Sequence, residues 1–140
     1  MSSLISLFQL LQLTRSQVQY GYLLSGVPKE QLSDLAQHHY LVTFMAWQLA
    51  LGCKQAGAKI DILKVVEICL IHDLGELFGG DINWFYARIN PEARKMAKSF
   101  ENENNKFLAH AFGDQKSHFE ELQIAAHNNE SDEARIAKLA

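Results

Sequence analysis

The chain has 140 residues, of which 48% are hydrophobic and 21% charged, a composition typical of soluble globular proteins. Its formal net charge of −3 argues against a broad nucleic-acid surface, which needs clustered basic side chains, although a small phosphate ligand is compatible with it. The apolar runs are shorter than a membrane span. We therefore expect one domain over residues 1–140 that binds neither nucleic acid nor membrane.

The N-terminal stretch MSSLISLFQLLQLTR has no basic residue before its apolar part, and glutamines interrupt that part. It predicts an amphipathic helix over about Leu4–Leu13 and argues against a signal peptide. The two cysteines, Cys53 and Cys69, lack the spacing of metal ligands. They predict buried free thiols in the reducing cytoplasm.

A second helix is predicted from about Leu32 to Leu51, with Gly52 and Gly57 marking its end. Spacings of three and four residues predict an inward face on this helix. That face would consist of His38, Val42, Met45, Ala46 and Leu49. His39 points about 100° away from His38, so we expect it at the surface or beside a site that His38 enters.

The third helix begins near Asp61, a suitable N-cap, and its residues from Ile62 onwards are apolar almost all round. Helices without a polar face usually lie at the centre of a bundle. The sequence therefore predicts a central helix over Ile62–Leu74, which ends in the stretch IHDLGELFGGD.

The fourth helix is predicted to start at Asn90 as cap, with Pro91 at its first position. Its predicted buried stripe is Ala93, Met96, Ala97, Phe100, Phe107, Leu108 and Ala111. The polar run ENENNK, Glu101–Lys106, is expected on its exposed side. Two more helices, over about Lys116–Ala126 and from near Ser131, complete an all-α domain of five or six helices.

The most apolar of the predicted helices, Ile62–Leu74, has several polar residues at its C-terminal end. If the helix continues for one turn, His72, Asp73 and Glu76 converge on one sector, because each residue turns by about 100°. Imidazole nitrogen beside carboxylate oxygen suits a divalent metal such as Mn, Fe, Co or Zn. A third ligand must come from another helix, and the inward-facing His38 is the natural candidate. Single histidines on apolar faces are mostly structural, so the combination is what indicates a metal site.

The pattern H…HDxxE…GD on an all-helical chain resembles the HD-domain metal-dependent phosphohydrolase superfamily, and more narrowly its 5'-deoxynucleotidase branch. LIHDLGELFGGDI resembles the signature around the His-Asp pair of that branch. YGYLLSGV resembles its entry segment, LAQHHY the segment with its first histidine ligand, and SDEARIAKLA the start of its final helix.

The resemblance implies a helical bundle around one divalent metal, sometimes two. Carried over to this sequence, it implies metal ligation by His38, His72 and Asp73. Glu76 would orient or deprotonate the attacking water, and Asp81 would act on the substrate or as a proton acceptor.

The function implied is metal-dependent release of phosphate from a small nucleotide, with a 5'-(deoxy)nucleoside monophosphate as first choice. Members of the family are commonly homodimers, so we expect a homodimer. One alternative is a regulatory domain that binds metal or nucleotide without turnover. Another is a hydrolase of the same fold that acts on diphosphates, cyclic nucleotides or alarmones.

Two departures from the family pattern stand out. The family's fourth ligand is an aspartate just after a segment like RIAKLA, and this sequence ends one residue earlier, at Ala140. Either the chain continues in a longer protein or this ligand is lacking, and the missing helix stop signal favours the first. In addition, the entry segment carries Gln19, Tyr20 and Tyr22 where the deoxynucleotidases have an arginine and a tryptophan.

Arg88 and Arg94 are candidates for substrate contacts, because a basic cluster begins seven residues after Asp81. Tyr22, in the entry segment, is a third candidate. The aromatic segment INWFYARI could stack on a base, but more simply it packs a loop onto the core. His110, His118 and His127 have no ligand-like partner in the sequence and are expected to be structural or exposed.

Overall fold

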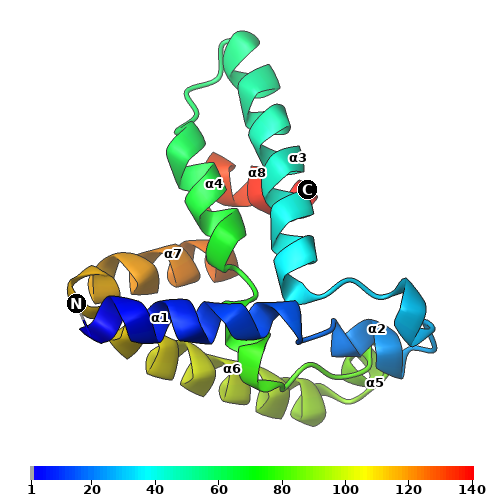
Figure 1. Cartoon of the computed structure of the whole chain (residues 1–140). Coiled ribbons are helices and arrows are strands. Elements are labelled where there is room, and N and C mark those ends of the chain that lie inside the picture. The colour runs from blue at the N-terminus through cyan, green and yellow to red at the C-terminus, as the bar shows by residue number, and fades with distance from the viewer. Residues whose placement is uncertain (1) are drawn as a thin grey trace. The chain divides into compact units, whose positions relative to one another are not determined.

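The computed structural model describes residues 2–140, and for side chains residues 4–140 (Figure 1). Over this range it contains eight α-helices, four short 3₁₀ helices and no strand, which confirms the predicted all-α class. The α-helices are α1 (Ser2–Gln12), α2 (Tyr20–Leu24), α3 (Leu35–Gln55), α4 (Ile62–Ile71), α5 (Trp84–Ile89), α6 (Pro91–Ala111), α7 (Lys116–Asn128) and α8 (Asp132–Leu139). The 3₁₀ helices are η1 (Leu13–Arg15), η2 (Lys29–Gln31), η3 (Leu74–Phe78) and η4 (Gly113–Gln115).

The chain forms two compact units. The part up to Gln37 together with Asp73–Lys116 is the carboxylate unit, and His38–His72 together with Ser117–Ala140 is the histidine unit. The names refer to the polar groups that each unit contributes to the chemistry described below. The short helices α2 and α5, which the periodicity did not predict, account for the helices beyond the expected six.

An apolar core joins α3, α4 and α8 within the histidine unit (Figure 1). Its buried members are Ala46, Ala50, Ile60, Val65, Cys69 and Ile136. α4 begins as predicted, because the Asp61 side chain accepts a hydrogen bond from the Lys64 backbone N–H at 3.2 Å. α8 likewise begins at a cap, where the Ser131 hydroxyl accepts from the Ala134 N–H at 3.1 Å.

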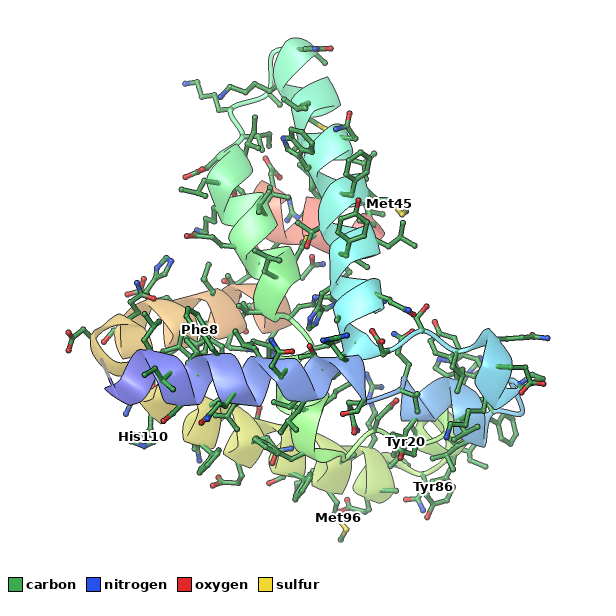
Figure 2. The ribbon with its side chains drawn as sticks, viewed as in Figure 1. Phe8, Tyr20, Met45, Tyr86, Met96 and His110 are labelled. Carbon is green, nitrogen blue, oxygen red and sulfur yellow. The ribbon has the colours of Figure 1, made fainter. Side chains whose placement is uncertain are left out.

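The buried face of α3 differs from the predicted one by about one residue of rotation. Met45 and Leu49, expected inside, are 41% and 44% exposed, and Met45 lies on the outer side of the helix (Figure 2). Ala46 is buried as predicted, and the other buried positions of α3 are Leu35, His39 and Ala50, which together follow the helical period of 3.6. The small alanines allow α3 to approach its neighbours closely, so the larger side chains remain outside.

The ends of α3 and α4 also differ from the predictions. α3 continues through Gly52 to Gln55, because one glycine in a helix costs only about 1 kcal/mol. It ends before Gly57, whose φ of +93° suits glycine. α4 ends at Ile71. This helix is not buried on all sides, since Leu63 is 66% exposed.

In the carboxylate unit, α6 packs against α1, α5 and η3. α6 begins as predicted at Pro91, with the Asn90 side chain accepting from the Ala93 N–H at 3.1 Å. The predicted apolar stripe is correct for Leu108, which is buried, but wrong for Met96, which points away from the helix and is 70% exposed (Figure 2). Asn104 and Asn105, expected outside, are buried together with Leu108 and Ala109.

The segment INWFYARI does not pack a loop onto the core. It forms α5, none of whose residues is buried, and Trp84 and Phe85 are both more than 60% exposed. The Asn83 side chain caps α5 by accepting from the Tyr86 N–H at 2.8 Å. Within residues 2–140, no helix combines the length and the apolarity that a membrane span requires.

Candidate metal centre

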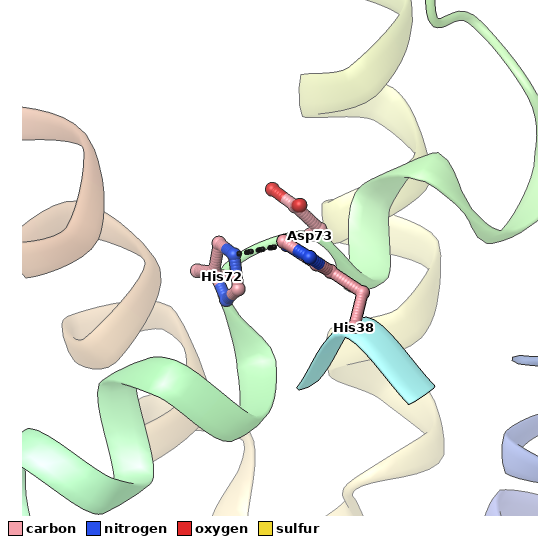
Figure 3. Close-up of side chains that lie close together, drawn as sticks. All are labelled: His38, His72 and Asp73. Atoms are coloured by element: carbon pink, nitrogen blue, oxygen red, sulfur yellow. Dashed lines mark hydrogen bonds between the residues drawn. The ribbon is translucent and has the colours of Figure 1, made fainter. Parts of the chain in front are cut away.

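Two imidazole rings meet within the histidine unit. His38 lies in the first turn of α3, and His72 directly follows the last residue of α4. Their Nε2 atoms are 3.2 Å apart, and their ring centroids are 5.2 Å apart with tilted planes (Figure 3). The structure thus brings the two predicted histidine ligands within reach of one ion.

The His72 ring is oriented by a backbone carbonyl. Its Nδ1 lies 2.8 Å from the carbonyl oxygen of Cys69. Because a carbonyl only accepts hydrogen bonds, Nδ1 carries a proton, and Nε2 is the ring nitrogen that faces His38. A hydrogen bond of this kind fixes the tautomer and orientation of metal-binding histidines.

Cys69 itself is a structural thiol and not a ligand. It is fully buried and free, as predicted, and Cys53 is a half-buried free thiol. Burial raises the pKa of the Cys69 thiol to about 11. The thiol therefore stays neutral at physiological pH, and the residue contributes through its backbone carbonyl alone.

Asp73 adds a carboxylate to the two imidazoles. Ligand atoms of His38, His72 and Asp73 lie within 4.8 Å of one another, and all three residues are half-buried. Asp73 directly follows His72 along the chain (Figure 3). Among the residues that the structure describes, this is the only such group of three or more potential ligands.

The donor set fits a divalent transition metal. Ligand atoms about 2.0–2.2 Å from such an ion lie roughly 3–4 Å apart, so small side-chain rotations would bring all three onto one ion. Two imidazole nitrogens and one carboxylate oxygen form the mixed set that Mn, Fe, Co and Zn accept. Three protein ligands leave coordination positions open, as catalytic sites require.

His39 is a buried member of the same group of rings. It is 6% exposed, and its ring centroid lies 5.9 Å from that of His38 and 5.1 Å from that of His72. The expectation that it lies at the surface is therefore wrong. The alternative, a position beside the site, agrees with these contacts.

Four carboxylates interact in the carboxylate unit, those of Asp73, Glu76, Asp81 and Glu101. Burial, followed by the charges of Asp73, Asp81 and Glu101, raises the pKa of Glu76 to about 9. Burial also raises the pKa of Asp81, although the backbone N–H of Gly21 opposes this rise. A divalent cation bound by Asp73 would stabilise the charged carboxylates and lower these pKa values.

Polar residues of α6 support η3, which carries Glu76. The Asn104 amide donates to the carbonyl oxygens of Gly75 at 2.7 Å and Gly79 at 3.3 Å. A Cβ on Gly75 would lie 2.8 Å from Asn105 and from Glu101, so α6 approaches too closely for any other residue there. Asn104 is buried because its amide satisfies the carbonyls of a chain that has left the α-helical pattern.

Asp81, predicted to be catalytic, lies against the N-terminal part of the carboxylate unit. Its carboxylate accepts a hydrogen bond from the backbone N–H of Gly21, in α2. A second bond joins the same regions, from the Gln17 side chain to the Glu76 carbonyl oxygen at 3.3 Å.

The predicted substrate residues lie on the surface of the carboxylate unit. Tyr22 on α2 is 58% exposed. Arg88 on α5 lies over the ring of Trp84, with its guanidinium carbon 5.4 Å from the ring centroid, and Arg94 is exposed on α6.

Glu101, Asn104 and Asn105 contribute to the site but are not predicted by the sequence. A signal is present in ENENNK, since these three residues recur at spacings of three and four and therefore share one face of α6. That face was expected to be exposed because it is polar.

The three remaining histidines are exposed or structural, as expected. His110 is exposed, and His118 lies 3.2 Å from Glu67. The His127 Nδ1 lies 3.0 Å from the Gln123 carbonyl.

Comparison with known structures reveals similar folds. The chain shares 27% identity with a conserved hypothetical protein from Pyrococcus furiosus, covering 96% of this chain and 73% of that one with a TM-score of 0.70. A protein from Pyrococcus horikoshii OT3 has 24% identity, coverages of 96% and 70%, and a TM-score of 0.72. No curated protein gives a significant match.

An HD-domain phosphohydrolase from Listeria innocua has 25% identity and a TM-score of 0.74. The match covers 93% of this chain but 60% of the Listeria chain, so the present chain spans less than two thirds of that protein. The sequence profile of the HD domain matches residues 14–140. Because this match extends over most of the chain, the protein belongs to the HD-domain family.

Proposed function

We propose that this protein is a metal-dependent phosphohydrolase that releases phosphate from a small nucleotide, with a 5'-(deoxy)nucleoside monophosphate as the first substrate to test. The observation that carries the proposal is the group of His38, His72 and Asp73, whose ligand atoms lie within 4.8 Å of one another. Membership of the HD-domain family and the similarity to a Listeria phosphohydrolase support the reaction class.

The three ligands would hold one divalent cation, such as Mn, Co, Fe or Zn. When bound, the cation supplies Lewis acidity and lowers the pKa of water. The chain contributes a ring orientation that is already set, because the Cys69 carbonyl holds the His72 Nδ1–H. The His72 Nε2 therefore needs no change of tautomer before it binds metal.

Glu76 would take the proton of the attacking water at its carboxylate. It lies one 3₁₀ turn from Asp73, and its backbone N–H donates to the Asp73 carbonyl at 3.0 Å. Burial, followed by the charges of its acidic neighbours, raises the pKa of Glu76, which makes its deprotonated form a stronger base. The same neighbours would repel a phosphate until cations compensate their charge.

Tyr22, Arg88 and Arg94 would contact the substrate. Arginine can bind a phosphate through two parallel hydrogen bonds, and Trp84 holds the Arg88 guanidinium through a cation–π contact. Tyr22 has an exposed ring that could stack on a base.

We further propose that the protein forms a homodimer in the cytoplasm. Between Leu35 and Gln55, α3 contains only one charged residue apart from its histidines, Lys54. Its exposed side carries the aromatic row Tyr40, Phe44 and Trp47, with centroid distances of 6.4 Å and 5.8 Å. An uncharged apolar face of this kind suits an identical face of a second copy, and light scattering of wild-type protein and Phe44→Glu would test it. The free thiols agree with a reducing compartment.

The experiment that tests the function combines metal analysis with phosphate release. Purified protein is loaded with Mn²⁺ or Co²⁺ and incubated with nucleoside mono- and diphosphates, cyclic nucleotides and alarmones. We expect one metal ion per chain and the fastest release from monophosphates. Metal binding without turnover of any compound would support a binding module, and faster turnover of another class would identify a different hydrolase.

A further inference from the structure

The carboxylate of Asp81 contacts the backbone of α2. The Gly21 N–H donates to its Oδ2 atom. A Cβ on Gly21 would lie 2.7 Å and 2.8 Å from the two carboxylate oxygens, closer than side-chain atoms normally approach. The absence of a side chain at position 21 is therefore what lets this carboxylate reach the α2 backbone.

Further hydrogen bonds join the same two segments. The Gln17 side chain donates to the Glu76 carbonyl at 3.3 Å, and the Asn83 amide donates to the Leu24 carbonyl at 2.8 Å and to the Ser25 hydroxyl at 3.3 Å. The bonds at residues 17, 21, 24 and 25 have partners 59, 60, 59 and 58 positions further along the chain. Residues 17–25 and 76–83 thus run side by side in one direction, in nearly the same register.

The middle bond of this register fixes the backbone between two exposed tyrosines. Tyr20 and Tyr22 flank Gly21 and are 42% and 58% exposed. The opposite segment begins at Glu76, which is the proposed base. The hydrogen bond between Asp81 and Gly21 therefore couples the position of the tyrosines to the segment that carries the base.

We propose that Asp81 is a positioning residue, which holds residues 17–25 against residues 76–83 and thereby places Tyr20 and Tyr22 for the substrate. This role rests on the proposed phosphohydrolase function and differs from the proton acceptor expected from the sequence. It requires a hydrogen-bond acceptor at position 81 but no negative charge. Asparagine, which retains one side-chain oxygen, meets that requirement and cannot accept a proton as a base.

Steady-state kinetics of Asp81→Asn, Asp81→Ala, Gly21→Ala and the Asp81→Ala/Gly21→Ala double variant test this role. The substrate is the nucleoside monophosphate that the wild-type protein hydrolyses fastest. We expect Asp81→Asn to keep the wild-type KM, with at most a small change in kcat from the charge lost beside Glu76. Loss of the bond in Asp81→Ala should raise KM roughly tenfold, with a smaller change in kcat.

Gly21→Ala should have the effect of Asp81→Ala, since the added Cβ displaces the same carboxylate. The double variant should be no worse than either single one, because both changes remove one interaction. Gly52→Ala is the matched control, as a Cβ there would meet nothing within 4 Å. It should keep wild-type KM and kcat.

A different pattern would overturn the proposal. If Asp81→Asn loses kcat by roughly 10²–10⁴-fold with KM unchanged, as Asp81→Ala would for a catalytic base, then Asp81 transfers a proton. Additive effects of the two single variants would likewise contradict a shared role.

Hydrogen–deuterium exchange separates this inference from the proposed function. Peptides that cover residues 17–25 should exchange faster in Asp81→Ala than in the wild type, whereas Asp81→Asn should match the wild type. Equal exchange in all three proteins would contradict the positioning role. Absence of phosphate release by the wild type would refute the proposed function, while the exchange data would still decide whether Asp81 holds this segment.

Discussion

In the histidine unit, apolar packing sets the position of the functional side chains, whereas in the carboxylate unit hydrogen bonds between distant segments do so. The carbonyl that orients His72 belongs to Cys69, a member of the apolar core. Glu76 lies on η3, whose carbonyls are held by side chains such as Asn104 and Gln17.

The two kinds of support differ in how they respond to change. Apolar packing is not directional, so a small loss of volume costs a moderate amount of stability and leaves the geometry nearly intact. A hydrogen bond to a buried carbonyl is directional, and its loss leaves the carbonyl without a partner. We therefore expect the carboxylate unit to be the part whose geometry is more easily disturbed.

The largest effect should follow removal of a ligand from the histidine unit. His72→Ala removes an imidazole that we propose binds the metal, so metal content should fall to background and kcat/KM by roughly 10³-fold or more. Metal analysis and phosphate release measure both. His118→Ala is the control, since His118 is an exposed histidine of the same unit. Full metal content in His72→Ala would contradict the assignment of this ligand.

A change in the carboxylate unit should separate metal binding from rate. Glu76→Gln should keep metal but lose roughly 10²–10⁴-fold in kcat, because glutamine cannot accept the proton of water. Glu103→Gln, on the exposed side of α6, should behave like the wild type. A wild-type rate in Glu76→Gln would show that another group acts as the base.

A stability comparison between the units should give a smaller effect. Asn104→Ala leaves the Gly75 and Gly79 carbonyls without their amide donor and should lower the free energy of unfolding by about 1–3 kcal/mol. Ile68→Val in the other unit should lower it by about 0.5–1.5 kcal/mol. Urea denaturation measures both, with the exposed Asn102→Ala as control. Only Asn104→Ala should also reduce kcat, and unchanged kcat would argue against its support of Glu76.

The smallest expected effect concerns pH. A hydrogen bond from the Asp61 backbone N–H, 3.1 Å long, lowers the pKa of Glu133 below its ordinary value of 4.5. A lowered pKa means that the contribution to stability is present above about pH 4.5 and is lost as pH falls through the native pKa. Glu133→Gln should therefore lower Tm slightly at pH 7 and by less at pH 3. Glu130→Gln serves as control, and an equal difference at both pH values would contradict this linkage.

The sequence predicted the features that depend on local signals, and it did not predict those that depend on bonds between distant segments. Apolar periodicity and caps predicted the helices around Asp61, Asn90 and Ser131, because these signals are local. His38 and His72 could be paired from the face and the end of two apolar helices. The sequence alone did not predict the support by Asn104 or the contact of Asp81 with Gly21. Those bonds join segments 25 to 60 residues apart and leave no periodic pattern.

The most direct test of the central claim is a crystal structure of the protein with Mn²⁺ or Co²⁺, with the ion located by anomalous scattering. We predict one ion bound by the Nε2 atoms of His38 and His72 and by a carboxylate oxygen of Asp73, each about 2.0–2.2 Å away. An ion bound elsewhere, or these three side chains without an ion at saturating metal, would contradict it.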